Sequence, residues 1–413
     1  MSYSIRDISL APLGKKRIEW VKCYMPVLKT LSERFKREQP FKGLRVSVCV
    51  HLEAKTAYLA LLLREGGAEV AVTGSNPLST KDDICAALAA EGMNVYAWFN
   101  STPEEYHEHI RKTLEFKPHI AIDDGGEFVT MLHDEHPEYG EFLIGGCEET
   151  TTGILKLRAR VKNGTLGFPM MAVNDANCKH LFDNRHGTGQ SSWDAIMYTT
   201  NNMITGKTVV VAGYGFCSSG IAMRAKGLGA NVIVTEVNPF RALEAAMDGF
   251  RVMKMDDAAP LGDIFVTATG CRDVITARHF EKMKDGVIMA NSGHFDVEIS
   301  KTDLEKMAVE KIERKPFIDG YVMPDGRILN LMAEGRLVNI TAGNGHPAEI
   351  MDLSFAIQAL SAEYLVKHGR GLAPGLYNVP ESIDREVAMI KLDAMGLGLD
   401  RLTPEQEAYL SAE

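Results

Sequence analysis

The chain has 413 residues, of which 45% are hydrophobic and 24% charged, and its formal net charge is −10. This composition is typical of a globular protein with two or three domains. The acidic balance argues against a nucleic-acid partner, and apolar runs far shorter than about 18 residues argue against a membrane span.

The first half of the chain alternates helical and extended patterns. Residues 15–39 predict one or two amphipathic helices, with Pro26 marking a start or a kink. The apolar segments that follow predict strands over 44–50, 69–73, 94–98 and 119–123, with helices over 53–64, 80–91 and 103–116. This alternation predicts a parallel sheet with helices on both faces and site residues at the carboxyl ends of the strands.

The middle of the chain, KTVVVAGYGFCSSGIAMRAKGLGANVIVTEVN, has the pattern of a dinucleotide-binding unit: strand, glycine turn, helix, strand and acid. Gly213 and Gly215 allow a tight turn and a close approach of a pyrophosphate to the helix N-terminus. The third glycine of the pattern is replaced by Ser218, and the next glycine is Gly220. Glu236 lies about 20 residues after Gly215, where a carboxylate binds a ribose diol and repels a 2′-phosphate. The pattern therefore predicts NAD rather than NADP.

The same alternation continues to about residue 341, so we predict an α/β fold with two Rossmann-like domains, parallel sheets and a small helical C-terminal segment. A strong helical pattern over 350–367 predicts a helix that returns to the first domain. The predicted division is a substrate-binding and catalytic domain over 1–180 with 345–373 returning to it, an NAD-binding domain over 181–344, and a helical subunit contact over 374–413.

Polar, turn-prone clusters gather between the two predicted domains: DDGG (123–126), EETTTG (148–153), NDANCKHLFDN (174–184) and NSGHF (291–295). Each cluster alone is explained by an ordinary turn or helix cap. Their joint occurrence beside a nucleotide fold predicts an active site.

These clusters, together with HLEAKTA, NPLSTKDD, VAGYGFCSSG, VTEVNP and AEGRLVNITAGNGHP, resemble the S-adenosylhomocysteine hydrolase family. The resemblance covers most of the chain, with the motifs in the same order. Two features differ from many members: the extended tail with Lys and Tyr is missing, and HLEAKT replaces a motif with Thr and then Glu or Gln. Both features resemble the short archaeal and thermophilic branch, some of whose members act on S-inosylhomocysteine.

The resemblance implies a redox-neutral hydrolysis of a nucleoside thioether. Oxidation of the ribose 3′-hydroxyl by NAD acidifies the 4′ C–H, homocysteine leaves from C5′, water adds, and the ketone is reduced again. It also implies a small-molecule nucleoside thioether substrate, one tightly bound NAD per subunit and a homotetramer. The odd number of seven cysteines without C-x-x-C spacing, and the absence of a signal pattern in MSYSIRDISL, favour a reducing, cytoplasmic location.

By the same resemblance, Lys179 takes the proton of the 3′-hydroxyl, and Asp183 and Asn184 orient it. This role leads us to expect a lowered lysine pKa. Asp124 acts at the 4′ carbon and shares the 5′ water step with His51.

The resemblance thus implies a catalytic set of His51, Asp124, Glu149, Lys179, Asp183 and His294. Some residues also bind the substrate or the cofactor. Glu149 holds the ribose hydroxyls, and His294 and His346 line the homocysteine side. The residues assigned to the cofactor are Thr150, Thr151, Thr152, Asn184, Gly213, Gly215, Phe216, Cys217, Glu236, Asn291, Gly293, Asn339 and His346.

The resemblance places the purine beside Glu53, Lys55 and Thr56, although an exposed ion pair at a helix start is the simpler interpretation of the first two. Lysine can only donate, so Lys55 suits the 6-oxo group of hypoxanthine, while Glu53 accepts from N1–H. Adenine instead presents an amino donor at position 6 and an acceptor at N1. Glu53 and Lys55 could exchange partners to bind it. We predict that the inosyl substrate is accepted, in preference to the adenosyl one.

Four alternatives compete with this assignment. A strict S-adenosylhomocysteine hydrolase differs only in its base. A 2-hydroxyacid or amino-acid dehydrogenase would release NADH at each turnover, and a non-catalytic relative would bind NAD and a partner protein. A metal enzyme would use the close pairs His107/His109 and His133/His136, but these lie on charged stretches that we expect to be exposed, and we predict no metal.

Overall fold

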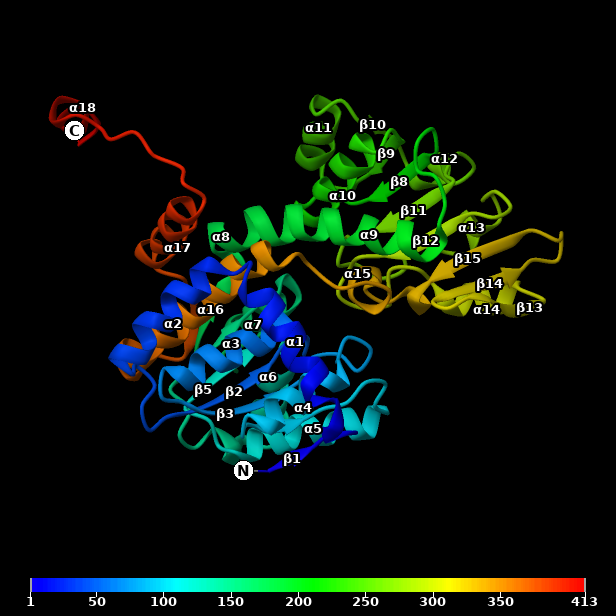
Figure 1. Cartoon of the computed structure of the whole chain (residues 1–413). Helices are drawn as coiled ribbons and strands as arrows, with labels where there is room; N and C mark the ends of the chain where they lie inside the picture. Colours follow the sequence, from blue (N-terminus) through cyan, green and yellow to red (C-terminus); the bar gives the residue numbers. More distant parts are fainter. Residues whose placement is uncertain (1, 412–413) are drawn as a thin grey trace.

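The computed structural model describes residues 2–411 and contains two α/β bodies, each built on one eight-stranded sheet and joined by a continuous run of helix (Figure 1). The sheet of the first body is entirely parallel. Its strands lie in the order β1 (Tyr3–Ser4), β4 (Asn94–Tyr96), β3 (Glu69–Thr73), β2 (Arg45–Cys49), β5 (Ile120–Asp123), β6 (Gly145–Glu148), β7 (Pro169–Ala172) and β16 (Gly375–Asn378).

Helices cover both faces of this first sheet, as predicted. Val46 and Val48 of β2 point into one core, whereas Cys49 points into the other, which is the alternation expected of a pleated strand. One face carries α1 (Ala11–Lys22), α2 (Pro26–Glu38), α3 (Ala54–Glu65), α4 (Asp82–Ala90), α16 (Ala348–His368) and α17 (Glu381–Ala394). The other carries α5 (Pro103–Glu115), α6 (Glu127–Asp134) and α7 (Thr151–Lys162).

The sheet of the second body is parallel over its first six strands and antiparallel at one edge. Its order is β10 (Arg251–Val252), β9 (Asn231–Thr235), β8 (Thr208–Ala212), β11 (Ile264–Thr267), β12 (Ile288–Asn291), β15 (Ile328–Met332), β14 (Ile318–Val322) and β13 (Glu310–Lys315). The predicted parallel sheet is confirmed over six strands, whereas the antiparallel edge formed by β15, β14 and β13 was not predicted. The missed signal is Pro-Asp-Gly before β15, where Gly326 adopts φ of +87° in the turn.

The helices of the second body include the long helix of the dinucleotide pattern. They are α10 (Phe216–Gly227), α11 (Pro239–Met247), α12 (Met255–Ala258), α13 (Ala277–Phe280), α14 (Lys301–Met307) and α15 (Val338–Thr341). Strands β8 and β9 coincide with the two apolar runs of the dinucleotide pattern, TVVVA and NVIVT.

Two chain crossings join the bodies, and they lie side by side. The outward crossing is α8 (Asn177–Lys179), a π-helical segment (His180–Gly187) and α9 (Thr188–Thr200). The return crossing is residues 342–347, which lead into α16. The two touch where His346 meets Gly187, because a Cβ on Gly187 would lie 2.9 Å from the His346 ring. Helix α16 packs on the first body, where it contacts α2 and α3.

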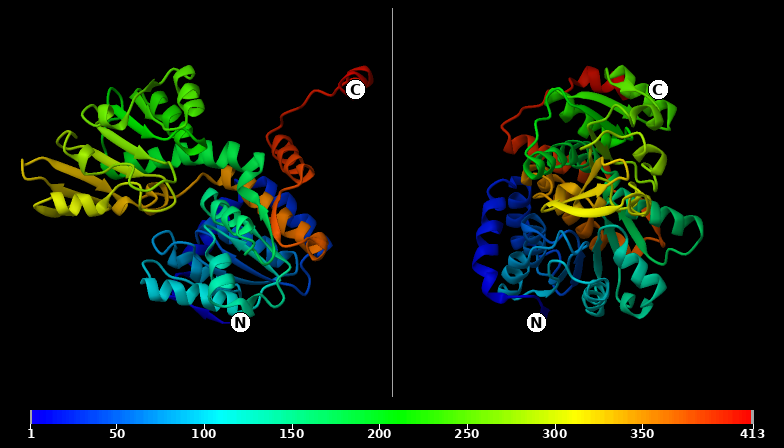
Figure 2. Two further views of the ribbon diagram at one scale, coloured as in Figure 1. Left: turned by 180° about the vertical axis from the view of Figure 1, so that it is seen from behind. Right: turned by 90° about the vertical axis from the view of Figure 1, so that its right-hand side faces the viewer.

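The C-terminal region has three parts. Strand β16, which was not predicted, pairs with β7, and α17 packs on α2 and α16. Residues 397–403 then lead to α18 (Pro404–Ser411), which lies away from the rest of the chain in Figure 1 and in the left view of Figure 2. Within residues 2–411, none of the helices has both the length and the apolar character needed to cross a bilayer.

Candidate active site

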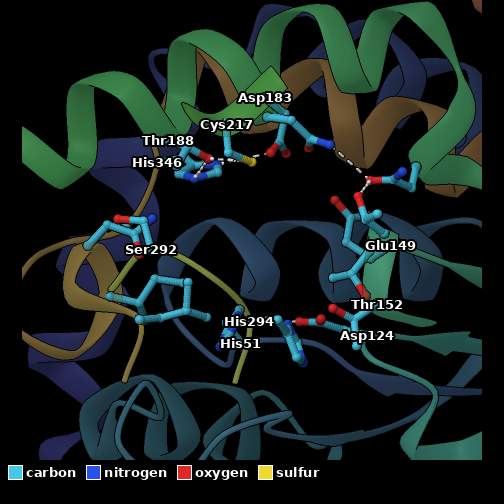
Figure 3. A pocket seen from close by; sticks show the side chains of 18 of the residues that line it. His51, Asp124, Glu149, Thr152, Asp183, Thr188, Cys217, Ser292, His294 and His346 are labelled. Atoms are coloured by element: carbon cyan, nitrogen blue, oxygen red, sulfur yellow. Dashed lines mark hydrogen bonds and ion pairs between the residues drawn. The ribbon is translucent and has the colours of Figure 1, made fainter. Parts of the chain in front are cut away.

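A cavity of about 380 Å³ lies between the two bodies. In the close view of Figure 3, Asp183, Thr188 and His346 lie on one side, and His51, Asp124 and His294 on the other. The cavity brings together most of the predicted site residues. They are His51, Glu53, Lys55, Thr56, Asp124, Glu149, Thr150, Thr151, Thr152, Lys179, Asp183, Asn184, Gly215, Phe216, Cys217, Gly293, His294, Asn339 and His346.

Three predicted cofactor residues, Gly213, Glu236 and Asn291, do not line the cavity. Gly213 forms the turn after β8, with φ of +93°. Asn291 is fully buried and donates to the carbonyl oxygens of Gly293 and Phe295 at 3.1 and 2.9 Å. Asn291 therefore holds the loop that carries His294 and does not itself face the cavity.

The N-terminus of α10 is open toward the cavity. Gly215 precedes the helix, no side chain caps it, and a Cβ on Gly215 would meet nothing within 4 Å. The N–H groups of the first turn and the helix dipole thus suit an anion such as a pyrophosphate. Glu236, directly after β9, accepts the N–H groups of Tyr214 and Asn238 at 2.7 and 2.9 Å, which fixes a carboxylate beside the glycine turn. These residues fit a dinucleotide.

Asn339 gives a second sign of a ligand. Its Oδ1 atom is buried and receives no hydrogen bond from the described part of the chain, while its amide group donates to Ser191 Oγ at 3.1 Å. A buried acceptor of this kind is usually paired, so a bound group is expected to supply the donor.

Gly220, which falls outside the glycine pattern, is explained by a helix crossing. A Cβ on Gly220 would lie 1.8 Å from the carbonyl oxygen of Arg185, and a Cβ on Gly189 would lie 2.6 Å from the carbonyl oxygen of Gly220. The helix of the dinucleotide pattern therefore packs backbone to backbone on the helical run that carries Lys179.

Lys179 lies among acceptors at the start of that run. Its Nζ atom donates to Asn184 Oδ1 at 2.7 Å and lies 3.3 Å from Asp183 Oδ1 and 3.6 Å from Glu149 Oε1. Burial lowers the pKa of Lys179, but the two carboxylates outweigh it, so the pKa lies above its ordinary value. The expectation of a lowered pKa is therefore wrong, because two carboxylates converge on one ammonium group.

The two carboxyl groups that flank Lys179 differ in their proton affinity. Burial raises the pKa of Asp183, but Lys179 and His346 more than offset this and hold it below its usual range. Burial raises the pKa of Glu149 to about 7 against the opposing effect of Lys179. Glu149 is therefore the carboxyl group that changes its protonation near neutral pH.

On the opposite wall, Asp124 lies beside His51, and its charge also acts on His294. Asp124 Oδ2 accepts from Ser75 Oγ at 2.8 Å and lies 3.6 Å from His51 Nε2, whereas its buried Oδ1 receives no hydrogen bond from residues 2–411. Burial lowers the pKa of His294 in spite of the Asp124 charge. A Cβ on Gly125 would lie 2.6 Å from His294 Nε2, so glycine at this position allows the two bodies to meet.

The predicted base-binding pair is not an exposed ion pair. Lys55 is 7% exposed, and its Nζ atom lies 2.8 Å from Glu53 Oε2 and donates to the carbonyl oxygen of Asn344 at 3.2 Å. Glu53 also caps α3 by accepting the N–H groups of Lys55 and Thr56. Both side chains therefore reach the cavity wall in a fixed arrangement.

Glu148, which supports two loops of the site, was not predicted from the sequence. Glu148 accepts the N–H groups of Gly125, Gly126 and Thr150 at 2.9–3.1 Å, which ties the Asp124 loop to the Glu149 loop. The sequence signal for Glu148 was its place in the EETTTG motif, directly before the predicted site residue Glu149. In the structure both acids are buried.

The histidine pairs have separate partners. His107 contacts Glu135 at 2.6 Å, and His136 contacts Glu138 at 2.9 Å. His109, predicted to be exposed, is buried against Trp98. Within residues 2–411, no group of three or more His, Cys, Asp or Glu side chains is arranged to hold a metal ion.

Two parts of the chain match models of domains from one enzyme family. Residues 2–143 match the family model of S-adenosyl-L-homocysteine hydrolase, and residues 184–345 match the model of its NAD binding domain. An S-inosyl-L-homocysteine hydrolase of Methanopyrus kandleri is 56% identical over 99% of this chain and 97% of its own length. The S-inosyl-L-homocysteine hydrolase of Methanothermobacter thermautotrophicus is 57% identical over 99% of this chain and 98% of its own length. An adenosylhomocysteinase of Pyrococcus abyssi is 55% identical over 99% and 97%, so identity alone does not separate the two activities.

Proposed function

The chain belongs to the S-adenosyl-L-homocysteine hydrolase family, and from this premise we propose that it hydrolyses the thioether of an S-nucleosyl-L-homocysteine to L-homocysteine and a nucleoside. NAD, when bound, accepts a hydride from the ribose and returns it at the end of the cycle. The observation that carries the proposal is the position of Lys179 and Asp124 around one cavity, beside the open N-terminus of α10.

The two walls of the cavity would serve different proton transfers. Lys179, oriented by Asp183 and Asn184, would take the proton of the 3′-hydroxyl. Asp124 would remove the 4′ proton, and its buried Oδ1 atom supports this role because it is an acceptor to which no residue within 2–411 donates. His51, held by Ser79 Oγ at 2.6 Å, would act at the 5′ position.

We propose hypoxanthine as the preferred base. Lys55 is a buried donor at the cavity wall and suits a 6-oxo acceptor, while the carboxylate of Glu53 suits the N1–H donor. The experiment is a competition between S-inosyl- and S-adenosyl-homocysteine on the NAD-loaded protein, with each released nucleoside quantified. Exclusive cleavage of the adenosyl compound would overturn the preference, and cleavage of neither would overturn the proposed function.

We further propose a cytoplasmic homotetramer with residues 397–411 as a subunit contact. Every side chain of this stretch is exposed, and the apolar ones include Leu397, Leu399, Leu402, Tyr409 and Leu410. Exposed apolar side chains on a segment that lies away from its own chain favour a protein partner. Sedimentation should give four times the chain mass, and a stable, active monomer would refute this assembly.

A further inference from the structure

One face of α16 holds the two carboxyl groups that flank Lys179. Ser354 Oγ donates to Asp183 Oδ2 at 2.6 Å, and Gln358 Nε2 donates to Glu149 Oε2 at 2.6 Å. Ser354 and Gln358 are one helical turn apart and fully buried. Neither lines the cavity, so any effect on the reaction must pass through the carboxyl group that each one holds.

The Gln358 amide is unusual because half of it is unused. Its Oε1 atom is buried and has no hydrogen-bond partner within residues 2–411, and neither has Glu149 Oε1. A carboxylate can only accept a hydrogen bond, whereas a carboxylic acid can donate one. When a proton adds to Glu149 Oε1, Oε2 remains an acceptor, so the hydrogen bond from Gln358 Nε2 persists in both protonation states and is stronger to the ionised carboxylate.

We propose that Gln358 is a positioning residue that keeps Glu149 hydrogen-bonded in both protonation states, so that Glu149 can take a proton from Lys179 and return it. The inference rests on the proposed function, in which Lys179 must become a free amine. In this step the N–H bond of the Lys179 ammonium breaks and an O–H bond forms on Glu149 Oε1. The products are an amine and a carboxylic acid, and no electrons are transferred.

The surroundings of Glu149 support this exchange. Its free Oε1 atom lies 3.6 Å from Lys179 Nζ, and the other charged groups that act on it are Asp183 of the helical run and Asp124 of the loop after β5. Burial brings the pKa of Glu149 to about 7, so both states are accessible near neutral pH. Asp183 needs no such partner, because its pKa stays below the usual range and a hydroxyl donor suffices.

The test is the pH dependence of kcat/KM for Gln358→Met and Gln358→Glu. Gln358→Met removes the donor to ionised Glu149, and Gln358→Glu, which matches the glutamine in size, forces two carboxyl groups to share a proton. Both variants should move the acid limb upward by about 1–2 pH units, the value of a hydrogen bond to a charged group, and leave KM at high pH unchanged. Ser361→Ala is the matched control, since Ser361 is buried on the same helix and its hydroxyl has no hydrogen-bond partner in the described part of the chain.

The outcomes separate this inference from the proposed function. If the wild type releases no homocysteine, the proposed function fails. If the wild type is active and kcat falls in both variants without any shift of the acid limb, Gln358 is only structural and the inference is overturned. An equal shift in Ser361→Ala would overturn it as well. Should Gln358→Met fail to fold, the Gln358→Glu profile alone decides.

Discussion

The carboxylate of Asp384 accepts the backbone N–H groups of Asn177 and Cys178, at 2.7 and 2.8 Å, and thereby caps the turn that carries Lys179. Asp384 belongs to α17, more than two hundred residues further along the chain, and is 7% exposed. The first N–H groups of a helix have no partner within the helix, and a carboxylate satisfies them while it complements the helix dipole. The C-terminal region therefore supports the site by holding the backbone of the Lys179 turn, although Asp384 does not line the cavity.

Asp384→Ala should lower both stability and turnover. Loss of the cap costs about 1 kcal/mol, and a small displacement of Lys179 should reduce kcat by about 10-fold to 100-fold with little change in KM. Urea denaturation and steady-state kinetics measure the two effects. Asp393→Ala, an exposed position on the same helix, is the control and should change neither. Wild-type kcat in Asp384→Ala would show that the cap does not position the lysine.

Gly220→Ala should destabilise the contact between α10 and the helical run. The added Cβ would lie 1.8 Å from the carbonyl oxygen of Arg185, and forced overpacking costs about 1–3 kcal/mol. The melting temperature should fall, and the stabilisation by added NAD should weaken because α10 is displaced. Gly227→Ala lies at the end of the same helix with nothing within 4 Å of its Cβ, so it should be neutral or stabilising by up to about 1 kcal/mol. A normal melting temperature for Gly220→Ala would contradict the close backbone packing of α10 on the helical run.

Lys179→Ala and Asp124→Asn should impair different partial reactions. Lys179→Ala should block reduction of bound NAD by the substrate, since the 3′-hydroxyl then keeps its proton. Asp124→Asn should retain some cofactor reduction but slow the exchange of the 4′ hydrogen with solvent. Each loss should reach about 10²–10⁴-fold. Absorbance of the reduced cofactor and isotope exchange in heavy water report the two steps, and equal losses of both steps in both variants would remove the assignment.

Strands β2 to β5 and the dinucleotide unit could be predicted from the sequence, because apolar runs and glycine turns are local signals. The role of Gly220 could not be, since it depends on which helix crosses α10. Gln358 and Asp384 occupy ordinary helical positions, and only the packing of α16 and α17 brings them to Glu149 and the Lys179 turn. The raised pKa of Lys179 was not predicted for the same reason, because it depends on how many carboxylates lie close to the ammonium group in the folded chain. Strand β16 forms only because β7 offers a free edge.

Lys55→Gln should shift the ratio of kcat/KM toward the adenosyl substrate. A glutamine amide can accept from the 6-amino group of adenine, whereas the wild-type ammonium only donates. One mismatched buried hydrogen bond costs about 1–3 kcal/mol, so the ratio should change by roughly 5-fold to 150-fold. A competition assay with both substrates measures it. An unchanged ratio would show that Lys55 does not contact the base.

The central claim is a redox-neutral hydrolysis in which NAD stays bound, and the most direct measurement follows thiol release and reduced cofactor in one sample. NAD-loaded protein is mixed with an excess of S-inosyl-homocysteine, homocysteine is titrated as free thiol, and NADH is followed by absorbance. The account predicts thiol in large molar excess over protein while NADH never exceeds one equivalent per chain. NADH that accumulates in step with product, or thiol that stops at one equivalent, would contradict it.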